Sequence, residues 1–90
     1  MAYKIEVTPR TQKDLKALPV QERQRVADRI DALKTDPSPE SYKEQKGRED
    51  FYRIRVGYHR VVYQVEDEVL LILIVRVGDR KEIYEIIRRL

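Results

Sequence analysis

The chain has 90 residues, 41% of them hydrophobic and 39% charged, and its 19 Lys and Arg residues exceed its 16 Asp and Glu residues by three. Because this length allows one modest core, we expect residues 1–90 to form a single domain, and the absence of cysteine excludes disulfides, a thiolate nucleophile and cysteine-ligated zinc. The N-terminus lacks the apolar core of a signal peptide and no apolar run approaches the roughly 18 residues of a membrane span, so we expect a cytoplasmic protein.

The first elements are a short strand and a short helix. Apolar and polar residues alternate over residues 3–7, which predicts a strand with one buried face. Thr8 followed by Pro9 predicts a helix start, in which the hydroxyl caps the helix and the proline occupies the first position. The apolar edge of this helix is formed by Leu15 and Leu18.

Pro19 begins a second helix, and together the two helices form a hairpin. Apolar residues recur at helical spacing along it, at Val26, Ile30 and Leu33. We expect this helix to stop at Asp36 and Pro37 and the stretch 36–41 to be a connecting loop.

The second half of the chain predicts three strands. Residues 51–56 and 59–65 each alternate between two faces, and Gly57 and Tyr58 form the turn between them. The acidic residues 66–68 form a second turn, with no metal-binding spacing. Residues 69–77 are apolar on both faces, which predicts a strand inside the sheet that ends at Gly78.

A short helix ends the chain. Asp79 and Glu82 match a capping box, and an apolar face follows at Ile83, Ile86, Ile87 and Leu90. About ten residues are too few for a helix to persist alone in water, so we expect it to dock on the sheet or on a partner.

Basic residues concentrate in the stretch 51–63, which holds three arginines, four aromatic residues and no acid. Arg53 and Arg55 lie two residues apart on a strand, so both point to one face, and Arg60 on the antiparallel neighbour can align with them. Three converging cations repel one another unless an anion sits among them, which indicates a phosphate site. The alternative is that they pair with acids of the helices, at Glu22, Asp28 and Asp31.

A second basic stripe follows the terminal helix. Arg80, Tyr84 and Arg88 are four residues apart, opposite the isoleucine face, and Arg80 lies at the helix N-terminus, where an anion is favoured. The alternative is a solvated helix face. We interpret the single histidine, His59, as packed and hydrogen-bonded rather than catalytic.

These motifs resemble toxins of the RelE/ParE superfamily, and most closely the RelE-type mRNA interferases. The resemblance covers essentially the whole chain and rests on KGREDFYRIRVGYHRVVYQVEDE at 46–68 and RVGDRKEIY at 76–84, preceded by the helical hairpin. It implies an α+β fold of order β-α-α-β-β-β-α, with a small antiparallel-dominated sheet packed against the two N-terminal helices. It also implies a toxin that cleaves mRNA in the ribosomal A site and is inhibited by a RelB-type antitoxin.

The resemblance further implies the site residues. The positions of the family's catalytic residues are filled by Arg53, Arg55, Arg60, Arg80 and Tyr84. RNA phosphates would be bound by Arg53, Arg55, Lys46 and Arg88. The implied reaction is attack of an mRNA 2′-OH on the adjacent phosphate, which requires neither a metal nor a cofactor.

The chain departs from the family pattern at several positions. The archetype has lysines at the positions of Arg53 and Arg55, many relatives have histidine at Asp79, and leucine is usual at Gln45. Arginine stays protonated where lysine can lose its proton, so we expect a slow nuclease that acts by electrostatics and positioning. Two alternatives are a ParE-like DNA gyrase inhibitor without nuclease activity and a degenerate module that binds only its antitoxin.

Overall fold

The computed structural model describes residues 2–37, 43–45 and 48–89. Its elements follow in the order β1 (Lys4–Val7), α1 (Pro9–Lys16), α2 (Val20–Ala32), β2 (Lys43–Gln45), β3 (Arg48–Val56), β4 (His59–Glu66), a 3₁₀ turn η1 (Asp67–Val69), β5 (Leu71–Asp79) and α3 (Arg80–Arg89). No helix within these ranges is long and apolar enough to cross a bilayer.

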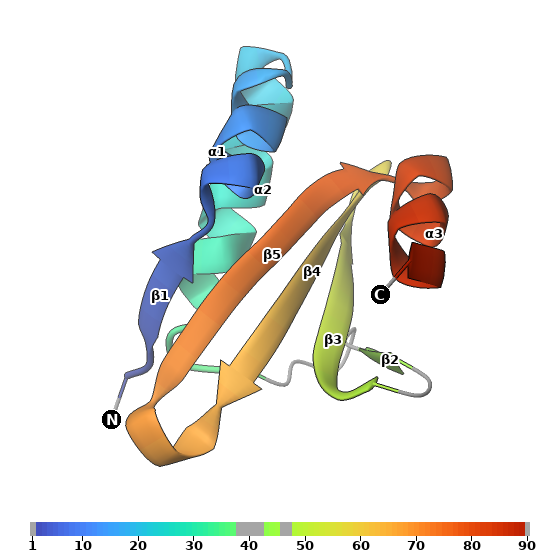
Figure 1. The fold of residues 1–90 in the computed structure, drawn as a ribbon. Coiled ribbons are helices and arrows are strands. Elements are labelled where there is room, and N and C mark those ends of the chain that lie inside the picture. Colours follow the sequence, from blue (N-terminus) through green and yellow to red (C-terminus); the bar gives the residue numbers. More distant parts are fainter. Residues whose placement is uncertain (1, 38–42, 46–47, 90) are drawn as a thin grey trace.

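The strands form one sheet in the order β1-β5-β4-β3-β2. β1 is parallel to β5, and the other neighbours are antiparallel, so the predicted antiparallel-dominated α+β fold is confirmed (Figure 1). β5 lies between β1 and β4, as its apolar sequence predicts. β2 is an addition to the predicted order, because the sequence Lys-Glu-Gln shows no apolar alternation.

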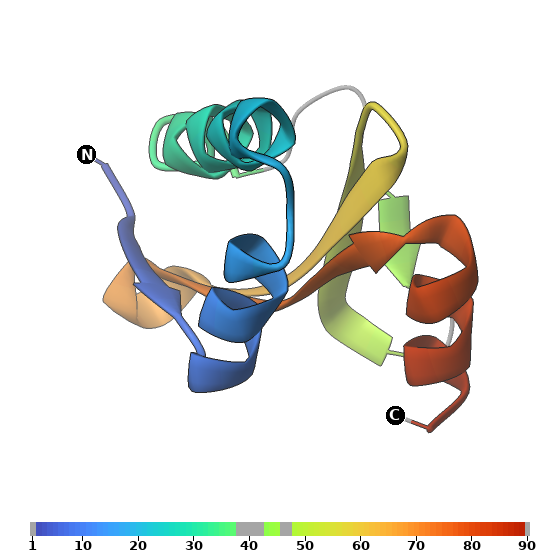
Figure 2. The ribbon, with the colours of Figure 1, turned by 90° about the horizontal axis from the view of Figure 1, so that it is seen from above.

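One face of the sheet carries the main core. Its strand residues are Ile54, Val56, Val61, Tyr63, Ile72, Ile74 and Val77. Val26, Ile30 and Leu33 belong to the same buried cluster, and Leu15 and Leu18 pack against it partly buried. α1 and α2 thus cover this face, while α3 lies apart from them, at the end of β5 from which it emerges (Figures 1 and 2).

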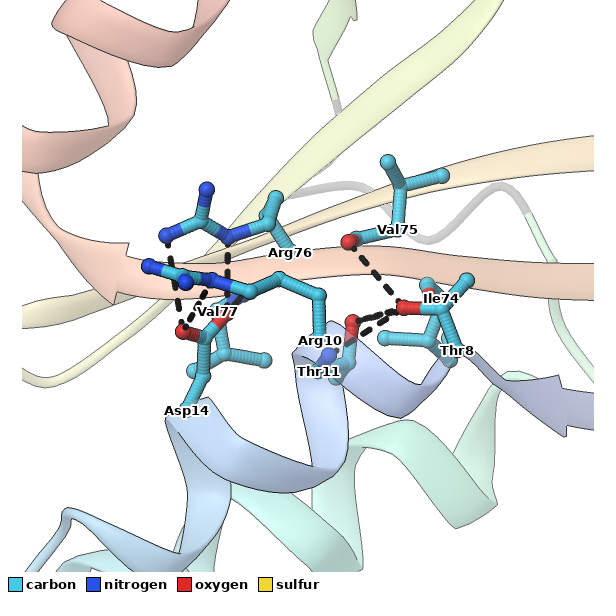
Figure 3. A network of polar contacts seen from close by, with 8 residues as sticks. All are labelled: Thr8, Arg10, Thr11, Asp14, Ile74, Val75, Arg76 and Val77. Atoms are coloured by element: carbon cyan, nitrogen blue, oxygen red, sulfur yellow. Dashed lines mark hydrogen bonds and ion pairs between the residues drawn. The ribbon is translucent and has the colours of Figure 1, made fainter.

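The cap of α1 forms as predicted, and the polar side of this helix seals the edge of β5 (Figure 3). β1 pairs with β5 only as far as Ile74. The Thr8 amide and the Thr11 hydroxyl donate to the Ile74 carbonyl oxygen at 3.2 and 3.0 Å, and the Val77 amide donates to Asp14 Oδ2 at 3.1 Å. Side chains of α1 therefore replace a neighbouring strand and satisfy backbone groups of β5.

The same carboxylate holds an arginine of β5. Arg76 Nε donates to Asp14 Oδ2 at 2.8 Å, and both side chains are largely buried. Arg76 follows a bulge: Tyr63 pairs with Ile74 and Val62 with Arg76, which leaves Val75 as the extra residue. α1 is thereby attached to the half of β5 that leads into α3.

β3 begins at Arg48, before the predicted start at Phe51. Three other predicted boundaries are wrong. α2 ends at Ala32 rather than at Asp36, because the amides of the following residues bond three residues back, as Lys34 does to the Asp31 carbonyl, and tighten the chain into turns. β5 starts at Leu71 rather than at Val69, which belongs to η1.

The third of these boundaries is at Gly78, which continues β5 instead of ending it. It pairs with Arg60 on β4. A Cβ atom at this position would lie 3.3 Å from Glu82 Cβ and 3.6 Å from Ile83 Cδ1. The missing side chain of Gly78 therefore allows α3 to pack closely on the strand from which it emerges.

α3 docks on the second face of the sheet, as expected for so short a helix. Ile83 and Val62 are fully buried, at 0% and 1% exposure, yet neither belongs to the main core cluster. Val62 pairs with Arg53, so their side chains share a face, and Arg53 also contacts Tyr84 of α3. α3 thus covers the face that carries the strand arginines.

Candidate active site

The β3–β4 hairpin places the three strand arginines on one face. Arg55 is directly opposite Arg60 in the antiparallel register, and Arg53 is opposite Val62. Directly paired residues project to the same side, so the predicted convergence of Arg53, Arg55 and Arg60 is confirmed. The two-residue turn that sets this register contains Gly57 in the left-handed region, at φ 61°.

α3 adds Arg80 and Tyr84 to the strand arginines. The guanidinium carbons of Arg53 and Arg80 lie 5.7 and 5.6 Å from the centroid of the Tyr84 ring. Tyr84 thus contacts both an arginine of β3 and the first residue of its own helix. We call Arg53, Arg55, Arg60 and Arg80 the arginine cluster.

Asp79 caps the helix that brings these residues. Its Oδ1 accepts a hydrogen bond from the Glu82 amide at 2.8 Å, as the capping motif predicts. This bond holds the pKa of the Asp79 carboxyl below its ordinary value. Because the Asp79 carboxylate already accepts from an amide at the N-terminus of α3, we assign the contribution of Arg80 to an anion site to its side chain.

The cluster concentrates uncompensated positive charge. Burial lowers the pKa of the Arg60 guanidinium, and neighbouring charges lower it further, in the order Arg55, Arg80 and Arg53. None of the four arginines forms a salt bridge with a carboxylate whose position the structure describes. Of the acids that could have paired with them, Asp31 binds Lys34 at 2.8 Å and Asp28 accepts from Gln24.

The Tyr84 hydroxyl responds to the same charges. Hydrogen bonding from Arg80 and then from Arg53 lowers its pKa, because two cations stabilise the phenolate. Tyr84 remains 43% exposed, so its ring and hydroxyl are accessible to a ligand. The arrangement provides fixed guanidinium donors around an accessible aromatic ring.

The other predicted site residues lie outside this cluster. Arg88 lines a hollow of about 380 Å³ along α3, together with Arg80 and Tyr84, so the predicted stripe is confirmed. Arg88 lies about 12 Å along the helix from Arg80, two turns away. Lys46 lies outside the described residues.

The histidine and the acidic turn form no metal-ligand group in the part of the chain that the structure describes. His59 is half-buried, opposite Asp79 in the register, and the expected hydrogen bond is not among those of the described residues. Glu66 and η1 form an exposed turn. No group of three or more His, Asp or Glu side chains within 2–37, 43–45 and 48–89 could hold a metal ion.

The link between α1 and the half of β5 that leads to the site was not predicted from the sequence. Arg76 is the one charged residue within the apolar stretch 69–77, and an unpaired charge there would be costly. The charge of Arg76 in this apolar stretch predicts a buried acidic partner but does not identify which residue it is. Asp14 lies on a helix 62 residues away, so only the packing of α1 on β5 identifies it.

Comparison with known proteins agrees with this geometry. A family model described as the ParE toxin of the type II toxin–antitoxin system parDE matches residues 5–84. The chain belongs to the RelE/ParE superfamily of toxins. It is 34% identical over 88 residues to a Methanocaldococcus jannaschii protein named as a RelE1 toxin. The aligned region covers 94% of this chain and 98% of the relative.

Solved structures of RelE toxins share the fold. A mutant of the Escherichia coli toxin RelE in the free state has a TM-score of 0.81 at 26% identity, covering 99% of this chain and 97% of that one. The toxin in the archaeal RelE–RelB complex from Pyrococcus horikoshii has a TM-score of 0.79 at 28% identity, covering 89% of this chain and 97% of that one. The predicted RelE-like fold is therefore confirmed, and the chain is a toxin of a RelBE-type toxin–antitoxin system.

Proposed function

We propose that this toxin is a ribosome-dependent endoribonuclease that cleaves mRNA in the A site and thereby inhibits translation in the cytoplasm. The observation that carries the proposal is the arginine cluster around Tyr84. Four guanidinium groups without a described carboxylate partner form a site for an anion with several oxygens, and a phosphodiester is such an anion.

The reaction is a transesterification within the RNA. The 2′-oxygen forms a bond to the adjacent phosphorus while the bond to the 5′-oxygen of the next nucleotide breaks. The 2′-hydroxyl gives up its proton and the 5′-oxygen receives one, which yields a 2′,3′-cyclic phosphate and a 5′-hydroxyl end. Negative charge grows on the phosphorane oxygens, and Arg60 and Arg80 are the groups we assign to stabilise it.

The remaining residues position the RNA. Arg53 and Arg55 bind the phosphate, Arg88 and Lys46 bind neighbouring phosphates, and Tyr84 stacks on a base or bonds the 2′-hydroxyl. Because an arginine side chain is a poorer general base than a lysine, the 2′-hydroxyl proton is removed with little help and we expect slow cleavage. The reaction as written uses no metal and no cofactor.

Primer extension on mRNA from a translation extract tests this function. The wild-type chain should produce cuts that keep a fixed phase with the codons and vanish when translation is blocked. Arg80→Ala should reduce cleavage by about 100-fold or more, since one donor to a developing oxyanion contributes that much. Tyr84→Ala should also slow cleavage.

Arg89→Ala is the matched control, because it removes the same charge from an exposed position of the same helix. It should cleave at the wild-type rate. Wild-type cleavage by Arg80→Ala and Tyr84→Ala would contradict the proposed site, and the absence of any cleavage by the wild-type chain would contradict the proposed activity.

Inhibition of DNA gyrase is the second candidate function, because the matching family model describes ParE toxins. A gyrase inhibitor does not require the arginine cluster. Loss of supercoiling by purified gyrase in the presence of the chain, without mRNA cuts, would favour this function. A chain that does neither would be a degenerate module that binds only its antitoxin.

We also propose a RelB-type antitoxin as the partner. Related toxins have been solved as RelE–RelB complexes from Pyrococcus horikoshii and Methanococcus jannaschii. An antitoxin would inhibit this chain by covering the arginine cluster or by displacing α3. Addition of the cognate antitoxin to the translation extract should therefore abolish the codon-phased cuts.

A further inference from the structure

A second basic region lies at the opposite side of the β3–β4 turn, where α2 faces the hairpin. Two hollows meet there, one of about 340 Å³ and one of about 70 Å³, and both are lined by Arg25, Val56 and Gly57. We call them together the turn groove. The larger hollow adds Arg29 and Arg55, and the smaller one adds Tyr58 and His59.

Positive charge exceeds negative charge in the turn groove. Three arginines line it together with two acids, Asp28 in the larger hollow and Glu22 in the smaller one. The Asp28 carboxylate accepts a hydrogen bond from Gln24 Nε2 at 2.9 Å, and neither acid forms a salt bridge with a cation that the structure describes. The larger hollow is therefore suited to an anion.

Arg25 is positioned by the turn itself. Its guanidinium nitrogens lie 3.7 Å from the place that a Cβ of Gly57 would occupy. The guanidinium therefore lies against the turn, whose backbone Gly57 shapes with its left-handed φ of 61°. Arg25 lines both hollows and forms no salt bridge with a described carboxylate, so its donors are available to a ligand.

An aromatic ring stands beside these arginines without a folding role. Tyr58 is 84% exposed at the tip of the turn, the highest exposure among the large hydrophobic residues of the described chain. Proteins that bind single-stranded RNA combine guanidinium groups on the backbone phosphates with aromatic rings on the bases. The turn groove supplies both within one surface.

Arg55 connects the turn groove to the arginine cluster. It lines the larger hollow, and it is also directly opposite Arg60 in the sheet register. Its Nε donates to the Gly57 carbonyl at 3.0 Å, which fixes the guanidinium at the boundary between the two regions. Basic residues therefore continue from Arg80 across the hairpin to α2.

We propose that the turn groove is a second RNA-binding site, in which Arg25 binds a backbone phosphate, Tyr58 stacks on an unpaired base, and Arg55 links this site to the arginine cluster. The inference rests on the proposed function, because it extends the RNA beyond the phosphate that is cleaved. It assigns specificity for strand length to Arg25 and Tyr58, two residues that take no part in the chemistry.

Binding of labelled, 2′-O-methylated single-stranded RNA, followed by fluorescence anisotropy, tests the second site without cleavage. An RNA of about 4 nucleotides fills the arginine cluster alone, whereas one of about 12 nucleotides also reaches the turn groove. Arg25→Gln should reduce the affinity for the long RNA severalfold. It should also lower the slope of log K against log salt concentration by about 0.7, because one phosphate contact is lost. Tyr58→Ala should reduce the affinity for the long RNA by about fivefold or more, because a stacked base is lost. Neither change should affect the short RNA.

Lys13→Gln is the matched control, because it removes one exposed charge from α1 of the same helical hairpin. It should bind both RNAs like the wild type, and all variants should retain the wild-type unfolding midpoint. Equal affinity of Arg25→Gln and Lys13→Gln for the long RNA would overturn the proposal. So would an equal loss on the short and long RNAs.

Cleavage in the translation extract distinguishes whether the turn groove binds mRNA or ribosomal RNA. If the groove binds the mRNA, Arg25→Gln should slow cleavage only of messages that extend beyond the A-site codon. If it binds ribosomal RNA, the same variant should slow cleavage at every message length. Long RNA that binds in the groove without any cleavage in the extract would refute the nuclease function and leave the second site standing.

Discussion

Replacement of Asp14 tests how α1 stabilises the part of the β5 edge that β1 does not cover. The Asp14 carboxylate accepts from the Arg76 guanidinium at 2.8 Å and from the Val77 amide at 3.1 Å. The side chains of Asp14 and Arg76 are only 10% and 16% exposed, so this pair is close to the buried limit. Asp14→Ala leaves a nearly buried cation and a backbone donor without their acceptor.

The expected loss of stability is large for a chain of this size. Removal of one partner of a buried ion pair costs about 3–5 kcal/mol, and the residual exposure of the Asp14–Arg76 pair favours the lower end, about 3 kcal/mol. A protein of 90 residues has a free energy of unfolding of about 5–13 kcal/mol. A loss of about 3 kcal/mol corresponds to a fall in Tm of about 12–24 °C.

Urea and thermal unfolding of the isolated chain, followed by circular dichroism, measure this loss. Asp14→Asn keeps an oxygen for the Val77 amide and should recover about 1 kcal/mol of the loss. Asp31→Ala is the control, because it breaks the exposed pair with Lys34 and should cost less than about 1 kcal/mol. A loss below about 1 kcal/mol for Asp14→Ala, with an unchanged m-value, would refute the structural role of this carboxylate.

Two further predictions concern the site. Gly78→Ala places a Cβ 3.3 Å from that of Glu82 and should push α3 outward. The rate of mRNA cleavage should therefore fall by a larger fraction than the unfolding midpoint does. A proportional decrease in the two quantities would contradict the close packing of α3. In a spectrophotometric pH titration, Tyr84→Phe should remove a tyrosine that ionises at lower pH than usual, because neighbouring cations stabilise its phenolate. Tyr3→Phe should remove a tyrosine that ionises at higher pH than usual, because its hydroxyl donates a hydrogen bond to Asp67 at 2.6 Å and this bond raises the tyrosine pKa. Ionisation of Tyr3 at lower pH than Tyr84 would contradict both assignments.

Much of the fold was predictable because its local patterns agree with its tertiary structure. The alternation in 51–56 and 59–65 identified two strands, and the two-residue turn between them set the register that aligns Arg55 with Arg60. The Thr8–Pro9 and Asp79–Glu82 motifs identified two helix starts, since a cap is formed by residues close in sequence.

Other features depend on contacts between distant residues, which no local pattern specifies. Gly78 looked like a strand end, but the requirement there is room for α3. The edge of β5 is satisfied by Thr11 and Asp14, more than 60 residues earlier in the chain. Short-range periodicity cannot report which helix covers which edge.

The sequence alone determined the charge types and the face of the sheet on which Arg53, Arg55 and Arg60 lie, because side chains alternate along a strand. Only the tertiary structure decided that Tyr84 contacts Arg53 of β3 as well as Arg80 of its own helix, since the contact with Arg53 depends on how α3 folds back from the end of β5. The physical reason is burial: Ile83 and Val62 bring α3 onto the second face of the sheet, and the site forms as a consequence.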